Sequence, residues 1–217
     1  MRTIICFAAV CLLLLTVTSC GNSSKAPQTF CDTVCIKDSI RFKGDHALKP
    51  ELILLPQDCG IDSILWTYEG MGFYRKVDLG FSDVKLNPAF IKCYFRDTSY
   101  AFLLFNDCIT GRGYQVMIPV SKSGSYSKRS SGINRFDPKF NIEEGMLAYT
   151  DRGNIYVEEI ATGKQAMMTF GQATELDYET IHETIDSVMV TRNDIYVKIR
   201  LNNKWEELQK KIKLALP

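Results

Sequence analysis

Short apolar runs separated by turn-forming residues recur along most of the chain. Some of them alternate apolar and polar residues, as in the segment 197–201, and this is the period of a β-strand with one buried face. Gly, Asn and Asp mark the turns between them, for example in Asp151-Arg152-Gly153-Asn154. The pattern predicts a mostly β fold with antiparallel strands. The predicted strands are 33–42, 52–55, 64–68, 73–79, 91–95, 100–105, 113–120, 146–150, 154–160, 165–170, 187–191, 194–201 and 208–213.

Three stretches depart from this pattern. Residues 176–185 place Ile181 and Ile185 four positions apart, which predicts one short helix. Residues 121–139 are rich in Ser, Lys, Gly and Arg and predict a long exposed loop. The segment 205–214 fits either a helix or a strand. We expect a single β-rich domain over residues 31–217, built as an antiparallel meander, a β-sandwich or a partial propeller.

The amino-terminal residues carry a different pattern. Arg2 precedes an apolar run from Ile4 to Val17, and small and polar residues follow the run. A basic start with an apolar stretch of this length is typical of a secretory signal peptide. The run is shorter than the about 20 residues that a membrane-spanning helix needs. We therefore expect residues 1–19 to be a signal peptide and the protein to be exported.

The junction Val17-Thr18-Ser19-Cys20 resembles the lipobox of bacterial lipoproteins, in which an aliphatic residue and two small residues precede an obligatory cysteine. The resemblance implies cleavage before Cys20, a diacylglyceryl thioether on its sulfur and an acyl chain such as palmitate on its new amino group. Each buried methylene contributes about 0.8 kcal/mol, so several chains on one residue hold a domain at a bilayer. The polar residues that follow predict a flexible, lipidated tether over residues 20–30. The implied location is a bacterial membrane, the outer rather than the inner one; the alternative is an ordinary secretory signal with an unrelated cysteine at the cut.

Residues 145–171 resemble one blade of a β-propeller of the TolB or prolyl-oligopeptidase type. They contain a strand with Leu147-Ala148-Tyr149, a tight turn, an Ile-Tyr-Val strand, a Thr162-Gly163-Lys164 turn and a third strand. Ile-Tyr-Val occurs at 155–157 and again at 195–197. A blade takes about 40–50 residues, so the resemblance implies a propeller-like meander rather than a closed ring.

Composition narrows the functional classes. The chain has 26 Lys and Arg against 25 Asp and Glu, so it lacks the basic excess of a nucleic-acid-binding protein. With only 2 His and no paired Cys/His spacing, the sequence predicts no metal site. Nucleophile-elbow, phosphate-loop and calcium-loop motifs are absent from it. We expect no cofactor, and His182 is expected at the surface or near a helix cap.

Five cysteines follow Cys20, so at most two disulfides can form among them and one thiol is left over. Export makes disulfides chemically possible. If Cys31 and Cys35 shared a strand, they would lie about 13 Å apart and could not join each other. Each would then pair with one of the later three. The possible disulfide cysteines are Cys31, Cys35, Cys59, Cys93 and Cys108.

Two groups of residues are candidate binding sites. The loop between Asn106 and Tyr114 carries Asp107 as a carboxylate and Arg112 as an anion clamp, although a hairpin turn favours the same residue types. The second group is an aromatic platform that would stack sugar rings, unless its members belong to the core. Its members are Trp66, Tyr68 and Tyr74.

These patterns together predict a lipid-anchored cell-envelope protein with a non-catalytic binding or accessory role. Its expected partners are the membrane, through the lipid, and a protein or glycan of the envelope. One alternative is an envelope hydrolase whose catalytic residues are scattered over loops; a cleft that gathers Asp107, Arg112 and a distant carboxylate or His would favour it. The other is a glycan-binding lipoprotein, which an exposed row of aromatic rings would favour.

Overall fold

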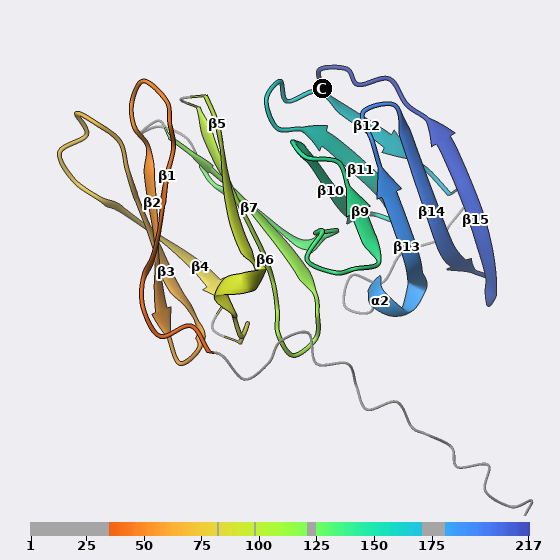
Figure 1. Ribbon diagram of the computed structural model, residues 1–217, viewed down its shortest axis with the longest axis horizontal. Helices are drawn as coiled ribbons and strands as arrows, with labels where there is room; N and C mark the ends of the chain where they lie inside the picture. Colours follow the sequence, from red (N-terminus) through yellow and green to blue (C-terminus); the bar gives the residue numbers. More distant parts are fainter. Residues whose placement is uncertain (1–34, 82, 98, 121–124, 171–180) are drawn as a thin grey trace, which may run out of the picture.

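The computed structural model describes residues 35–81, 83–97, 99–120, 125–170 and 181–217. Its strands form three sheets, which are seen side by side in Figure 1. The first sheet is an antiparallel meander in sequence order, drawn in orange and yellow. Its strands are β1 (Ile40–Lys43), β2 (Glu51–Gln57), β3 (Gly60–Thr67) and β4 (Arg75–Phe81).

The central sheet has seven strands and curls into a half-barrel. Its order is β12-β11-β10-β8-β7-β6-β5, so neighbouring strands follow one another along the chain except that β9 is skipped. The short 3-10 helix η1 (Pro88–Phe90) leads into it. The strands are β5 (Ile91–Arg96), β6 (Tyr100–Asn106), β7 (Gly113–Pro119), β8 (Ser127–Gly132), β10 (Met146–Asp151), β11 (Asn154–Glu159) and β12 (Gln165–Met168).

The third sheet has the order β15-β14-β13-β9 and is drawn in blue except for β9 (Figure 1). The pair β13 and β9 is parallel, whereas the other pairs in this sheet are antiparallel. The helix α2 (Ile181–Thr184) directly precedes β13. No helix within the described ranges is long and apolar enough to cross a membrane. The strands are β9 (Phe140–Ile142), β13 (Ile185–Val190), β14 (Asp194–Leu201) and β15 (Lys204–Lys211).

Two β-sandwiches share the central sheet. The first sheet packs on β5–β7 through a core that includes Leu54, Ile64 and Leu103, while the third sheet packs on β10–β12 through a core that includes Val157 and Val197. Each buried side chain of this size contributes about 1.5–3 kcal/mol. A third, smaller cluster fills the inner face of the curl, which is why β6 and β10 are apolar on both faces. Its buried members are Phe102, Leu104, Leu147 and Ile160.

The expected fold class is confirmed: the protein is mostly β, its sheets are largely antiparallel, and β10, β11 and β12 form a meander within residues 145–170. The exposed-loop prediction for 121–139 is wrong in part, because β8 lies inside it. The polar residues of β8 gave no strand signal, yet its backbone pairs with β7. The ambiguous segment 205–214 is mainly the strand β15. Of the predicted helix 176–185, residues 176–180 lie outside the described residues, and α2 covers only four of the others.

The strands β7, β8 and β10 meet at a close backbone contact where the two sandwiches join. A Cβ atom added to Gly113 would lie 2.0 Å from the carbonyl oxygen of Gly132. Beside them, the Asn134 amide nitrogen donates to Asn106 Oδ1 at 2.8 Å and to the carbonyl oxygen of Phe105 at 3.0 Å. These partners satisfy a buried amide that would otherwise cost about 1–3 kcal/mol.

The amide of Gln115 completes this buried polar group. Its nitrogen donates to Asn134 Oδ1 at 3.2 Å and to the carbonyl oxygen of Ala148 at 2.7 Å. Gln115 belongs to β7 in the first sandwich and Ala148 to β10 in the second, so the bond between them joins the two sandwiches. The junction is therefore held by backbone contact and by paired polar groups rather than by apolar packing alone.

We expect Gly113→Ala to lower the free energy of unfolding by at least about 2 kcal/mol, because the added methyl group cannot fit without moving β7 away from β8. The measurement is urea unfolding followed by circular dichroism. Gly72→Ala is the matched control: nothing lies within 4 Å of the added carbon, although its φ of +75° disfavours alanine by about 1 kcal/mol. An equal or smaller effect at Gly113 would contradict the close contact.

Candidate functional site

The carboxylate of Asp107 bonds to its own chain. Its Oδ1 accepts hydrogen bonds from the backbone nitrogens of Lys85 at 3.0 Å and Ile109 at 3.3 Å. Its Oδ2 accepts from the backbone nitrogen of Thr110 at 3.0 Å and from the Thr110 hydroxyl at 2.6 Å. Asp107 is buried. It therefore shapes the turn between β6 and β7 and joins that turn to the segment at Lys85.

Arg112, the proposed anion clamp, also has a partner within the chain. Its Nε donates to the carbonyl oxygen of Ser130 at 2.6 Å, and its guanidinium lies 5.4 Å from the ring centre of Tyr114. The loop as a whole is a turn closed by the backbone bond from Asp107 to Arg112 at 2.9 Å. The geometry gives this pair a structural role in the hairpin.

The three aromatic side chains of the expected platform do not form one exposed row. Trp66 is 3% exposed in the first core, and Tyr68 packs against the same core. Their ring centres are 6.2 Å apart. Tyr74 is exposed, and its hydroxyl donates to Glu51 Oε2 at 3.1 Å. Trp66 shares a strand face with the fully buried Ile64, which places its ring in the core.

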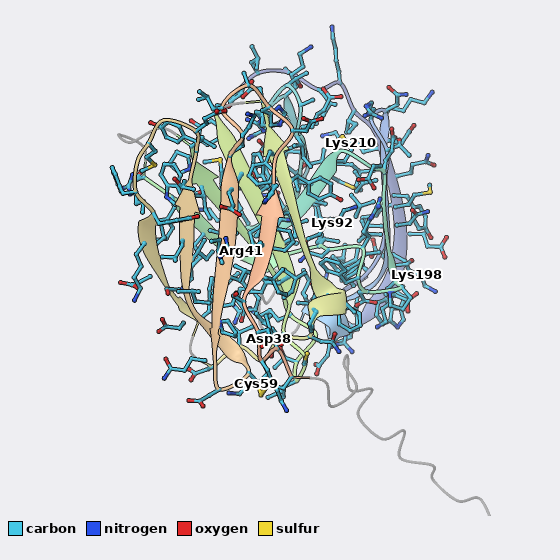
Figure 2. All side chains as sticks on the ribbon, turned by 60° about the vertical axis from the view of Figure 1, so that its left-hand side comes forward. Asp38, Arg41, Cys59, Lys92, Lys198 and Lys210 are labelled. Carbon is cyan, nitrogen blue, oxygen red and sulfur yellow. A yellow bond between two sulfur atoms is a disulfide. The ribbon has the colours of Figure 1, made fainter. Side chains whose placement is uncertain are left out.

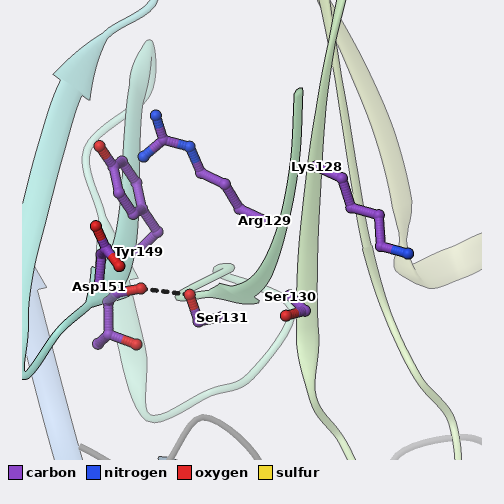
Figure 3. Close-up of a pocket in the computed structure, with 7 residues that line it drawn as sticks. Lys128, Arg129, Ser130, Ser131, Tyr149 and Asp151 are labelled. Atoms are coloured by element: carbon purple, nitrogen blue, oxygen red, sulfur yellow. Dashed lines mark hydrogen bonds between the residues drawn. The ribbon is translucent and has the colours of Figure 1, made fainter. Parts of the chain in front are cut away.

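A polar pocket lies along β8 and β10, at the junction of the two sandwiches (Figure 3). Its volume is about 350 Å³. Figure 3 shows the Arg129 side chain extending over Tyr149, with Asp151 beside that ring, whereas Lys128 points to the opposite side of β8. The lining residues are Lys128, Arg129, Ser130, Ser131, Tyr149, Thr150 and Asp151.

Arg129 is held in the pocket by an aromatic stack. The guanidinium carbon lies 3.5 Å from the ring centre of Tyr149, and this ring stacks on Tyr156 with centres 5.3 Å apart. Burial is the largest influence on the arginine and lowers its pKa, while the charges of Glu158 and Asp151 offset part of this effect. The side chain is thus a fixed, partly desolvated cation.

A second, smaller hollow of about 20 Å³ adjoins the pocket on the inner face of the curl, and Arg129 and Tyr149 line both. Glu158 lies at its wall and is 6% exposed. The Glu158 carboxylate accepts hydrogen bonds from Arg96 of β5 and from Gln165 Nε2 of β12, the latter at 3.1 Å. Because Arg96 also donates to the carbonyl oxygen of Ile160, it connects β5 to the far part of the same sheet.

The sequence interpretation missed this pocket. Arg129 falls in the segment expected to be an exposed loop, and Tyr149 was noted only as part of the blade-like strand. The alternation of β10 was the available signal: Ala148 faces the second core, so Tyr149 must face the other side. Within the part of the chain that is described, no three His, Cys, Asp or Glu side chains are placed to hold a metal ion. His182 lies on α2, and its side chain is not among those described.

The cysteines divide into bonded and free. Cys35 and Cys59 form a disulfide at the end of the first sheet where the described chain begins, near Asp38 (Figure 2). This pairing is one of those that the sequence left open. Cys108 is also disulfide-bonded. Cys31 and the expected lipid site Cys20 lie outside the described residues.

Cys93 is the free cysteine of the described residues, on β5 against the first core. Burial raises the pKa of its thiol, so little reactive thiolate forms at neutral pH.

We expect the mature, unreduced protein with a lipidated Cys20 to show almost no reactive thiol when native and one per chain in denaturant. The measurement is titration with a chromogenic disulfide reagent. Cys93→Ala is the control and should remove the signal in denaturant. Rapid reaction of the native protein, or several thiols after unfolding, would contradict the assignment.

No known protein-family model matches this chain, and no curated protein sequence matches it significantly. The functional interpretation therefore depends on the sequence patterns and on the geometry of the pocket.

Proposed function

We propose that this protein is lipid-anchored in the bacterial cell envelope and that its β domain binds a small polar ligand without transforming it. The observation that carries the binding role is Arg129, a partly buried arginine stacked on Tyr149 in a pocket of about 350 Å³. Pockets of this size suit small molecules. The location rests on the lipobox-like junction ahead of Cys20.

The contacts of the polar loop favour binding over hydrolysis. A shared cleft that gathered Asp107, Arg112 and another acid or a histidine would favour the hydrolase alternative. Instead, the Asp107 carboxylate accepts four hydrogen bonds from neighbouring residues of its own chain. A carboxylate so engaged serves to fix the turn.

A bound glycan would differ from the sequence-based expectation in both its location and its contacts. Trp66 and Tyr68 lie in or against the first core and leave no open stacking surface there. The ring of Tyr149 is covered by Arg129 on one side and stacks with Tyr156. A sugar in the proposed pocket would therefore be held by polar groups and by the arginine.

We expect Cys20→Ala to abolish membrane fractionation and to leave a soluble or uncleaved protein, because the thioether that carries the lipid can no longer form. The measurements are carbonate-washed membrane fractionation and mass analysis of the amino terminus. Cys11→Ala is the matched control: it removes a cysteine from the expected signal peptide and should leave both readouts unchanged. Normal processing with unchanged membrane association in Cys20→Ala would overturn the anchor.

A further inference from the structure

We propose that the pocket between β8 and β10 recognises a carboxylate on a small hydroxylated ligand, with Arg129 as the group that binds it. This inference rests on the proposed binding function and names the ligand class of the same pocket.

The donors of Arg129 are available to a ligand. A guanidinium carries five N–H donors, and none from Arg129 makes a hydrogen bond or an ion pair with the residues that the structure describes. Arg96, on the inner face of the same sheet, differs: its guanidinium is paired with Glu158 and bonded to the carbonyl oxygen of Ile160. The same sheet therefore holds one arginine in a close ion pair and one that feels the charges of Glu158 and Asp151 without such a pair.

The stack with Tyr149 gives Arg129 a fixed orientation. The guanidinium carbon is 3.5 Å from the ring centre, and Tyr149 is itself stacked at 7° on Tyr156. A planar guanidinium whose orientation is already fixed can form two parallel hydrogen bonds to a carboxylate with little further loss of side-chain conformational entropy. Binding an anion also compensates a charge that burial disfavours.

The charges around the pocket favour a single negative charge on the ligand. Asp151 adds a carboxylate to the lining. The ammonium of Lys128 lies 4.1 Å from the ring centre of Phe81 in the first core, on the other side of β8, and adds no second cation to the pocket. A phosphate monoester carries about −1.5 to −2 at neutral pH and would face one cation and one anion. A carboxylate carries one negative charge and meets less of the repulsion from Asp151 than a phosphate monoester does.

The rest of the pocket suits hydroxyl groups. Ser130 lines it and carries a hydroxyl group. Asp151 and the phenol of Tyr149 add further polar groups to the wall. A volume of about 350 Å³ accommodates a molecule of the size of one sugar ring. The ligand class that combines these properties is a sugar acid.

The test is calorimetric titration of the purified, lipidated protein in detergent with glucuronate, glucose and inorganic phosphate. We expect saturable binding of glucuronate, with glucose at least about tenfold weaker, because only glucuronate offers the carboxylate. Arg129→Gln should weaken glucuronate binding at least about tenfold. Arg129→Lys keeps the positive charge but loses the planar guanidinium, so its affinity for glucuronate should lie between that of the unsubstituted protein and that of Arg129→Gln.

Arg200→Gln is the matched control. It removes an arginine that also lies over an aromatic ring, 5.8 Å from the ring centre of Trp205, but on β14 and outside the lining of the pocket, and it should change the affinity for glucuronate by less than about twofold. Thermal unfolding of each variant checks that the domain is intact. Any of three results overturns the carboxylate assignment: no glucuronate binding, equal binding of glucose and glucuronate, or tighter binding of phosphate.

The outcomes separate this inference from the proposed function. Binding of glucose that is insensitive to Arg129→Gln would leave a binding role in place and remove the carboxylate from it. The membrane anchor is tested by Cys20→Ala alone and does not depend on any of these titrations.

Discussion

The backbone contact between Gly113 and Gly132 is the constraint on which the architecture depends. It lets β7 and β8 approach closely at the point where β8 turns from β7 toward β10, with Gly132 paired to Tyr149. Beside this crossing, the buried amides of Gln115 and Asn134 bond to each other and also to the Ala148 carbonyl oxygen and the Asn106 side chain. Without this junction the central sheet would divide into one four-stranded and one three-stranded sheet. The pocket, which lies along β8 and β10, would then lose one of the strands that line it.

Ion pairs then hold the curl of the central sheet. Arg96 and Glu158 come from strands at opposite ends of the strand order, and both side chains are largely buried, at 13% and 8% exposed. Lys92 and Glu144 form a second, more exposed bridge at 3.2 Å between the same two parts of the chain. An exposed pair contributes little free energy, but the buried one is bonded by Gln165 as well and fixes the spacing of the two walls.

Most of the fold was predictable because its strands carry their own signals. The run 101–105 is apolar throughout, and in the structure it is buried on both faces, by the first core and by the inner cluster. The two Ile-Tyr-Val segments lie on β11 and β14, and their Ile and Val side chains meet in one core while the tyrosines face away. Local alternation was enough to specify both.

The site was harder to predict because it depends on contacts between distant segments. Strand β8 is made of Ser, Lys, Arg and Gly, and its conformation comes from pairing with β7 rather than from its own side chains. Arg129 therefore looked like part of a solvated loop. The polar residues that did attract notice, Asp107 and Arg112, are partners of the turn that contains them. A hairpin and a ligand loop use the same residue types, so sequence alone does not distinguish them.

The disulfide between Cys35 and Cys59 has a mechanical consequence for strand β1. Tension that arrives at Cys35 passes through the sulfur bridge directly to the turn between β2 and β3, since the bridge spans 24 positions of sequence. Strand β1, at the edge of its sheet and joined only to β2 there, lies within that closed loop and bears no load. Without the bridge, tension that reached Cys35 from its amino-terminal side would separate β1 from β2 one hydrogen bond at a time.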